Sequence, residues 1–117
     1  PKRDLTFVTD TVSGFESIYR CDKLFGEFVN IGMNQEISIK ELIDKISNIL
    51  EVKLEIEQER SRVRPLKSEV GQLVCNNQKL IKNTDWEPRF DLENGLKETI
   101  MWMKSNLHNY KNEDYAV

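Results

Sequence analysis

Apolar residues recur at helical spacing between Ser38 and Leu50, and this segment is the best-defined element that the sequence predicts. Ser38 and Glu41 form the S-x-x-E pattern of a capping box, which marks the beginning of a helix. A stripe at this spacing predicts a core helix rather than a cofactor-binding segment. The residues of the stripe are Ile39, Leu42, Ile43, Ile46, Ile49 and Leu50.

Three more helices are predicted from capping residues and apolar spacing. The first runs from about residue 11 to residue 20 with Asp10 as its N-cap, and a short one covers residues 77–83 after Asn76. The last and longest helix follows the cap Asp91. Apolar residues fall at helical spacing at Val12, Phe15, Ile18 and Tyr19 in the first helix, and Leu92, Leu96, Ile100, Met103 and Leu107 are expected to point inward from the last.

Strands are predicted by short apolar runs and by alternation. LTFV (residues 5–8) and EFVNIG (residues 27–32) are typical of strands, VKLEIEQE (residues 52–59) has the alternation of a half-exposed strand, and QLVC (residues 72–75) predicts a short one. Alternating strands and helices indicate an α/β piece with a few strands and about four helices. Because EFVNIG is apolar enough to need neighbours on both sides, we expect the sheet that it joins to be missing from this chain.

Composition restricts the possible partners. The chain has 117 residues and a net charge of −3, which disfavours general nucleic-acid binding. Two cysteines, Cys21 and Cys75, and the single His108 lack metal-ligand spacing, and two lone cysteines fit the reducing cytoplasm. No apolar run approaches the roughly 20 residues that span a bilayer. We therefore expect one cytoplasmic domain, residues 1–117 with a polar tail at 109–117, cut from a longer protein.

Positive charge is concentrated in the segment RSRVRPLKSEV, residues 60–70. It contains Arg60, Arg62 and Arg64, and Pro65 opposes a regular helix, so a loop is predicted here. A guanidinium group binds phosphate through paired hydrogen bonds, which a lysine cannot reproduce. A solvated basic turn has the same composition. In an otherwise acidic chain, the local cluster favours a small anionic ligand over a polyanion.

The chain carries binding groups without a catalytic constellation. Its five glycines are scattered, and none forms the G-x-G-x-x-G loop of dinucleotide-binding proteins. Tyr19 and Lys23 have the spacing of a proton shuttle but fall across a predicted helix end, and one histidine near the tail does not support a Ser/His/Asp set. We expect no catalytic, cofactor-binding or metal-binding residue in this chain.

Four segments, in order, resemble the C-terminal part of the extended short-chain dehydrogenases/reductases that act on nucleotide sugars. RDLTFVTDTVSGF (residues 3–15) is similar to the opening of that part, and FVNIG (28–32) with EISIKELIDKI (36–46) to its next strand and helix. RVRPLKSEV (62–70) stands where these enzymes carry a diphosphate-binding arginine. The segment 76–104 resembles their closing helix, Trp-x-Pro turn and terminal helix. Together the segments identify the chain as a member of the NAD-dependent epimerase/dehydratase family.

The resemblance implies a division of labour. In this family a Rossmann part holds NAD or NADP and the catalytic Tyr and Lys, and the C-terminal part holds the nucleotide and diphosphate of the sugar donor. Arg3 and Arg64 match the arginines that reach the diphosphate, and Asn30 and Glu69 match positions near the nucleotide. The implied partners are a nucleotide-diphospho-sugar and the Rossmann part, whose sheet FVNIG would join, with no nucleic acid and no membrane. Without the Rossmann part, self-association is expected.

Within the family, the R-P-x-x-S-E-V loop and the ending NLHNYKNEDYAV are similar to NAD-dependent 4,6-dehydratases of nucleotide-linked N-acetylglucosamine, from cell-surface polysaccharide biosynthesis. Such enzymes oxidise C4 of the sugar with NAD, eliminate water across C5 and C6, and return the hydride to C6. A 4-epimerase or decarboxylase has the same kind of C-terminal part, and a stand-alone module that binds a phosphorylated ligand or a protein is a third possibility. UDP, GDP and dTDP donors all remain compatible. By itself the chain is expected to be inactive.

Overall fold

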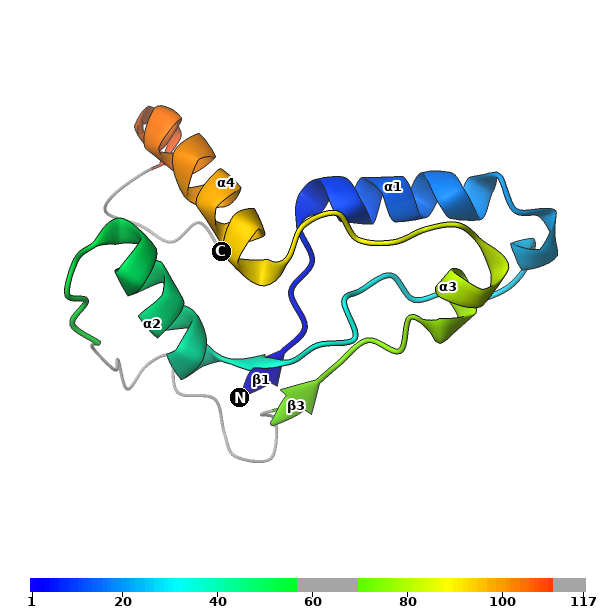
Figure 1. The fold of residues 1–117 in the computed structure, drawn as a ribbon, viewed down its shortest axis with the longest axis horizontal. Helices are drawn as coiled ribbons and strands as arrows, with labels where there is room; N and C mark the ends of the chain where they lie inside the picture. Colours follow the sequence, from blue (N-terminus) through cyan, green and yellow to red (C-terminus); the bar gives the residue numbers. More distant parts are fainter. Residues whose placement is uncertain (57–69, 111–117) are drawn as a thin grey trace.

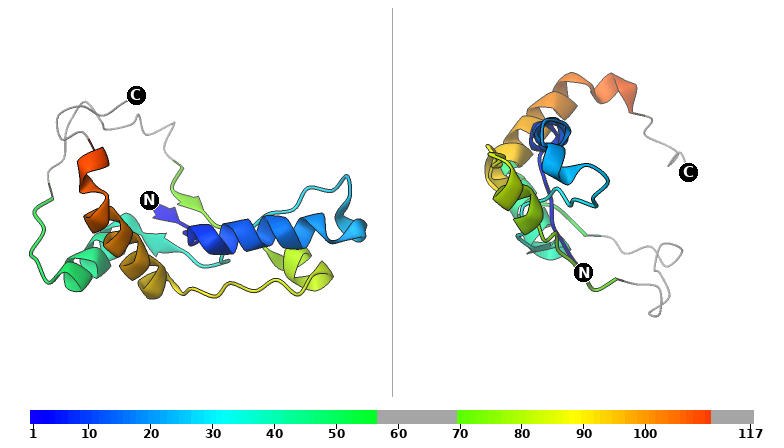
Figure 2. Two further views of the ribbon diagram at one scale, coloured as in Figure 1. Left: turned by 90° about the horizontal axis from the view of Figure 1, so that it is seen from above. Right: turned by 90° about the vertical axis from the view of Figure 1, so that its right-hand side faces the viewer.

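The structure, a computed structural model, describes residues 1–56 and 70–110 (Figure 1). Within these two ranges, four α-helices accompany a small three-stranded sheet, which confirms the predicted α/β portion. Figure 2 shows α2 and α4 together at one end of the molecule and α1 with α3 at the other. In chain order the elements are β1 (Lys2–Arg3), α1 (Val8–Tyr19), η1 (Asp22–Leu24), β2 (Ile37–Ser38), α2 (Ile39–Leu50), β3 (Gln72–Leu73), α3 (Gln78–Asn83), α4 (Leu92–Ser105) and η3 (Leu107–Asn109).

The sheet is built around β1, which lies between β2 and β3 (Figure 1). β1 pairs antiparallel with β2, so that Lys2 lies opposite Ser38, and parallel with β3, so that Lys2 lies opposite Gln72. The N–H of Lys2 donates to the carbonyl oxygen of Gly71 at 2.8 Å, and the N–H of Asp4 donates to that of Leu73 at 3.0 Å. Three segments that are distant in sequence therefore meet around the residues of β1.

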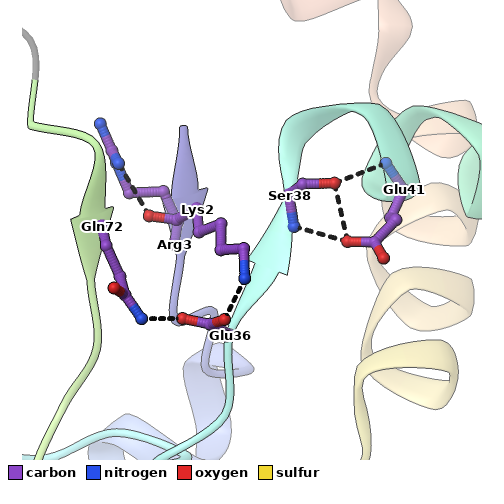
Figure 3. A network of polar contacts seen from close by, with 6 residues as sticks. All are labelled: Lys2, Arg3, Glu36, Ser38, Glu41 and Gln72. Carbon is purple, nitrogen blue, oxygen red and sulfur yellow. Dashed lines mark hydrogen bonds and ion pairs between the residues drawn. The ribbon is translucent and has the colours of Figure 1, made fainter.

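The predicted caps of two helices, α2 and α4, are confirmed. Ser38 Oγ accepts the N–H of Glu41 at 3.2 Å, and a carboxylate oxygen of Glu41 accepts the N–H of Ser38 at 2.9 Å, which completes the capping box (Figure 3). The hydrogen bonds from Ser38 hold the pKa of the Glu41 carboxyl below its usual range. α4 begins after Asp91, whose carboxylate accepts the N–H of Asn94 at 2.8 Å. These bonds satisfy N–H groups that the first turn of a helix leaves without partners.

α1 begins earlier than predicted, at Val8, so that Asp10 lies in its first turn and is not the N-cap. The Asp10 side chain is buried, with 1% of its surface exposed, and accepts the N–H groups of Arg89 and Phe90 at 2.9 and 3.0 Å. Trp86, 4% exposed, donates its indole N–H to the Asp10 carbonyl oxygen at 3.1 Å. Trp86 thus anchors the turn before α4 to α1. A long-range contact has displaced the local capping role of Asp10.

Most of the predicted strands are wrong. LTFV (residues 5–8) is not a strand: β1 lies before it, and its last residue begins α1. Residues 27–32 and 52–56 also lack strand structure, and Phe28 is 96% exposed. The strand QLVC is confirmed at Gln72–Leu73. An apolar run forms a strand only where a neighbouring backbone offers hydrogen bonds, and neither the EFVNIG segment nor residues 52–56 pair with a strand within 1–56 and 70–110.

The chain buries little apolar surface. Its solvent-accessible area is 10080 Å², whereas a compact monomer of this mass would have about 6,600 Å². Its radius of gyration is 17.2 Å, against about 13 Å expected for a compact domain. The α2 stripe, predicted to be core, is only partly buried: Ile39 is exposed, the other five residues of the stripe are half-buried, and none is fully buried. The buried hydrophobic residues among those described are Leu24, Ile37, Leu80 and Trp86.

The apolar stripe of α1 lies at the surface. Tyr19 is 81% exposed, and Val12 and Phe15 are also exposed. Met103 on α4 and Leu107 in η3 are exposed, although they were predicted to point inward from one helix. An amphipathic pattern identifies the apolar face of a helix but not the structure that covers it. No helix within the described ranges is both long enough and apolar enough to cross a membrane.

Candidate functional site

Asp4 connects three chain segments at the end of β1. Its carboxylate accepts the N–H of Met33 at 3.0 Å through one oxygen and the N–H of Cys75 at 3.0 Å through the other. The side-chain amide of Asn77, a residue only 3% exposed, donates to the carbonyl oxygen of Gly32 at 2.8 Å. We call Asp4, Gly32, Met33, Cys75 and Asn77 the β1 junction. It holds the segment before β2 against the segment that follows β3.

Gly32 and Cys75 approach each other closely within the β1 junction. A Cβ atom added at Gly32 would lie 2.3 Å from Cys75 Cβ and 2.7 Å from its sulfur, so only glycine fits without movement. Burial, and to a lesser extent the charge of Asp4, raises the pKa of the Cys75 thiol. The thiol therefore stays protonated at neutral pH and is a poor nucleophile. We assign Cys75 a packing role.

Gly32→Ala is expected to lower the free energy of unfolding by about 1–3 kcal/mol, because the new methyl group overpacks the junction. Denaturant unfolding measures the change. Gly71→Ala is the matched control, since nothing lies within 4 Å of a Cβ built at Gly71, and it should be close to neutral. Adding Cys75→Gly should recover part of the lost stability. Equal effects of the two glycine replacements would contradict the close approach of Gly32 and Cys75.

A cavity of about 560 Å³ adjoins the β1 junction. Asp4, Asn30 and Asn76 contribute polar groups to its wall, and α1 contributes Phe15 and Ile18. Asn76 also accepts the N–H of Gln78 at 3.1 Å, but the N-cap of α3 is Asn77, so the prediction of Asn76 as the cap is wrong by one residue. The remaining lining residues are Thr6, Thr11, Val29, Ile31, Gly32, Leu73, Val74 and Cys75. The cavity thus combines amide, hydroxyl and carboxylate groups with an apolar wall.

The structure describes two of the four predicted site residues. Arg3 is half-buried, and its guanidinium donates to the carbonyl oxygen of Lys2 at 2.8 Å (Figure 3). It also donates to the carbonyl oxygen of Val70 at 2.8 Å. Asn30 is exposed and lines the cavity beside Asp4, whereas Arg3 is not among the residues that line it. The other two predicted residues, Arg64 and Glu69, lie outside the described residues. Arg3 is therefore bound to the residue that follows Glu69 in the sequence.

Sequence reasoning missed the side chains that hold these segments together. Glu36 accepts hydrogen bonds from Lys2 and Gln72, on the neighbouring strands (Figure 3). The hydrogen bond from Lys2 holds the pKa of the Glu36 carboxyl below its usual range. The partners of Asp4 are likewise distant, 29 and 71 residues away in the sequence. No local pattern marks such contacts, because they depend on how the strands pair.

The second large hollow, about 630 Å³, lies between the beginning of α1 and α4. Its lining is mainly apolar, including Phe7, Phe90 and Trp102, and contains none of the predicted site residues. The ring centroids of Phe7 and Phe90, which precede α1 and α4, are 4.4 Å apart, so this hollow belongs to the packing around the beginnings of the two helices. Within residues 1–56 and 70–110, no group of three or more His, Cys, Asp or Glu side chains could hold a metal ion.

Comparison with known proteins connects this geometry to a family. The family model described as GDP-mannose 4,6 dehydratase matches residues 1–99. The human dTDP-D-glucose 4,6-dehydratase is 30% identical over 118 residues, which cover 98% of this chain and 33% of that protein. A UDP-glucuronate 4-epimerase from Thermodesulfobacterium geofontis is 31% identical over 106 residues, which cover 90% of this chain and 31% of that protein.

Solved structures show the same fold. An epimerase from Methanothermobacter thermautotrophicus superposes with a TM-score of 0.81 at 26% identity, over 92% of this chain and 31% of the epimerase. The dTDP-glucose 4,6-dehydratase of Bacillus anthracis, solved in complex with NAD, gives a TM-score of 0.74 at 27% identity, over 92% and 32% of the two chains. The chain thus spans about a third of the length of these relatives. It belongs to the GDP-mannose 4,6 dehydratase family, whose structural neighbours are extended short-chain dehydrogenases/reductases.

Proposed function

We propose that this chain binds the nucleotide and diphosphate of a sugar donor, as the C-terminal part of an NAD-dependent 4,6-dehydratase. The donor would carry N-acetylglucosamine, as in the dehydratase of the legionaminic acid pathway, which the arginine loop and the chain ending resemble. The family match over residues 1–99 is the observation that carries the proposal. Its 30% identity to a dTDP-D-glucose 4,6-dehydratase favours dehydration as the reaction of the whole enzyme.

Arg3 and Arg64 would bind the diphosphate, and Asn30 and Glu69 would lie near the nucleotide. A diphosphate carries at least two negative charges, which two arginine forks can neutralise through paired hydrogen bonds. The hydrogen bond from Arg3 to Val70 supports this assignment, because Val70 directly follows the segment that contains Arg64. Binding energy from this unreacting part of the substrate would position the sugar for the chemical steps.

NAD would be held by the Rossmann part of the enzyme, which corresponds to the two-thirds of the relatives' length that this chain does not match. This chain does not fit the cofactor, since its sequence has no glycine-rich dinucleotide loop. Residues 1–117 would then form one C-terminal domain with a polar tail at 109–117. The exposed apolar side chains of α1, together with Phe28, support a covering Rossmann part. Two free cysteines are in keeping with a cytoplasmic location.

A nucleotide-sugar 4-epimerase or decarboxylase is the second candidate, favoured by the 31% identity to a UDP-glucuronate 4-epimerase. An acid pair beside the catalytic Tyr, in the Rossmann part, would distinguish a dehydratase from these enzymes. A stand-alone module is the third candidate. The open shape and exposed apolar surface of the chain disfavour it.

The chain of 117 residues, purified by itself, is expected to show no turnover with NAD and a nucleotide-N-acetylhexosamine. The reason is that it lacks a dinucleotide loop and a credible Tyr/Lys shuttle. The full-length gene product, assayed beside it with UDP-, GDP- and dTDP-linked N-acetylglucosamine, should release a 4-keto-6-deoxy sugar from one of them. Turnover by the chain alone would overturn the proposal that cofactor binding and catalysis belong to the Rossmann part. A C4-epimerised product from the full-length protein would establish the second candidate instead.

A further inference from the structure

We propose that Asp4 is a positioning residue of the nucleotide-sugar site. Its carboxylate fixes the segment that carries Asn30 and the segment that holds Arg3 relative to each other. This inference rests on the proposed function, because it concerns how the binding residues are arranged. Asp4 itself would not contact the diphosphate, since a carboxylate repels phosphate oxygens.

The two hydrogen bonds of Asp4 join it to the two segments that contribute to the proposed site, residues 29–33 and 70–75. One oxygen of Asp4 accepts the N–H of Met33 at 3.0 Å. Met33 directly follows the cavity-lining segment 29–32, which contains Asn30. The other oxygen accepts the N–H of Cys75 at 3.0 Å, and Cys75 is the last residue of the segment 70–75, which begins at Val70. Val70 accepts the Arg3 guanidinium at 2.8 Å. Arg3 is thus linked to Asp4 twice, through the backbone and through the segment 70–75.

Only a carboxylate suits this position. Both partners are backbone N–H groups, so each side-chain oxygen must accept a hydrogen bond. An asparagine would offer one oxygen and one NH₂ group, which would face an N–H donor and leave it without an acceptor. Loss of one of these hydrogen bonds would let the segments 29–33 and 70–75 move apart. A misplacement of about 1 Å at a site that depends on geometry can cost about 100-fold.

Asp10 provides a matched control within the same chain. Its carboxylate also accepts two backbone N–H groups, those of Arg89 and Phe90, at 2.9 and 3.0 Å. It links α1 to the turn before α4, and neither Asp10 nor its two partners lines the 560 Å³ cavity. The two aspartates therefore share their chemistry and differ in what they connect. Replacing either aspartate should lower the stability of the protein, but only the replacement of Asp4 should change the affinity for the ligand.

The test compares Asp4→Asn and Asp10→Asn in the full-length gene product by calorimetric titration with UDP, GDP and dTDP. For whichever diphosphate the wild type binds, Asp4→Asn should raise Kd by about 10- to 100-fold with the stoichiometry unchanged. Asp10→Asn should leave Kd within about twofold of wild type, even if its melting temperature falls. Asp4→Glu keeps both acceptor oxygens and should recover part of the affinity.

The outcomes separate the inference from the proposed function. If Asp4→Asn lowers only the stoichiometry, or binds as wild type does, Asp4 is a structural residue and the inference fails while the function stands. If Asp4→Asn does not fold, Asp4→Glu decides: a raised Kd supports positioning, and a wild-type Kd overturns it. If the wild type binds none of the three diphosphates, the proposed function fails, and the inference fails with it.

Discussion

Arg64→Ala in the full-length gene product is expected to weaken nucleotide-sugar binding by about 30- to 1,000-fold and to leave NAD binding close to wild type. The change removes a charged donor from a phosphate site, which costs about 2–4 kcal/mol. Arg64→Lys should recover only part of the affinity, because an ammonium group keeps the charge but loses the fork. Calorimetric titration of the UDP-, GDP- and dTDP-linked sugars measures both effects.

Arg60→Ala and Arg62→Ala are the controls for Arg64→Ala, since they remove the same charge from the same segment. They should weaken binding much less if Arg64 is the residue that reaches the diphosphate. Equal losses for all three variants would mean that the segment acts through its net charge. Wild-type binding by Arg64→Ala would reduce the segment to a basic surface turn.

The 117-residue chain, purified alone, is expected to self-associate or to bind dyes that recognise apolar surface. Its accessible area, 10080 Å², is far above the roughly 6,600 Å² of a compact monomer, and large apolar side chains account for much of what is exposed. Phe15 and Phe28 are prominent among them. Light scattering across a concentration series and dye fluorescence provide the measurement. A strict monomer at high concentration without dye binding would refute the expectation.

A double variant, Phe15→Ser with Phe28→Ser, should reduce both dye binding and association. Met101→Ser serves as the control, because Met101 is also exposed but lies on α4. If the α1 surface is the one that a Rossmann part covers, the double variant should have the larger effect. The same double variant in the full-length gene product should weaken the attachment of the two parts and lower the melting temperature.

Local signals in the sequence predicted the helices well. The capping box of Ser38 and Glu41 and the cap Asp91 place the beginnings of α2 and α4 correctly, because a cap satisfies backbone groups within one turn. Such features depend on neighbours only a few residues away, so the sequence contains all the information needed to find them.

Strands and site contacts depend on partners that local sequence does not show. EFVNIG has the composition of a buried strand but remains unpaired within the described residues, and its predicted edge position in a Rossmann sheet stays a prediction. Asp10 is expected from the sequence to cap a helix, yet its carboxylate accepts N–H groups from a distant segment, as does that of Asp4. Tertiary contacts determined the outcome at these positions.

The central position of β1 has a consequence for the order of folding. The two partners of Asp4 lie 29 and 71 residues further along the chain, and both loops must close before the β1 junction exists. Loop closure costs entropy that grows with loop length, and contacts of high sequence separation form slowly. During synthesis, β1 leaves the ribosome before β3 and cannot pair with it until β3 has emerged. The helices, which close only local contacts, should form well before the binding site does. Chaperones that hold nascent chains would act in that interval, and a slow phase in nucleotide binding during refolding should report the closure of the β1 junction.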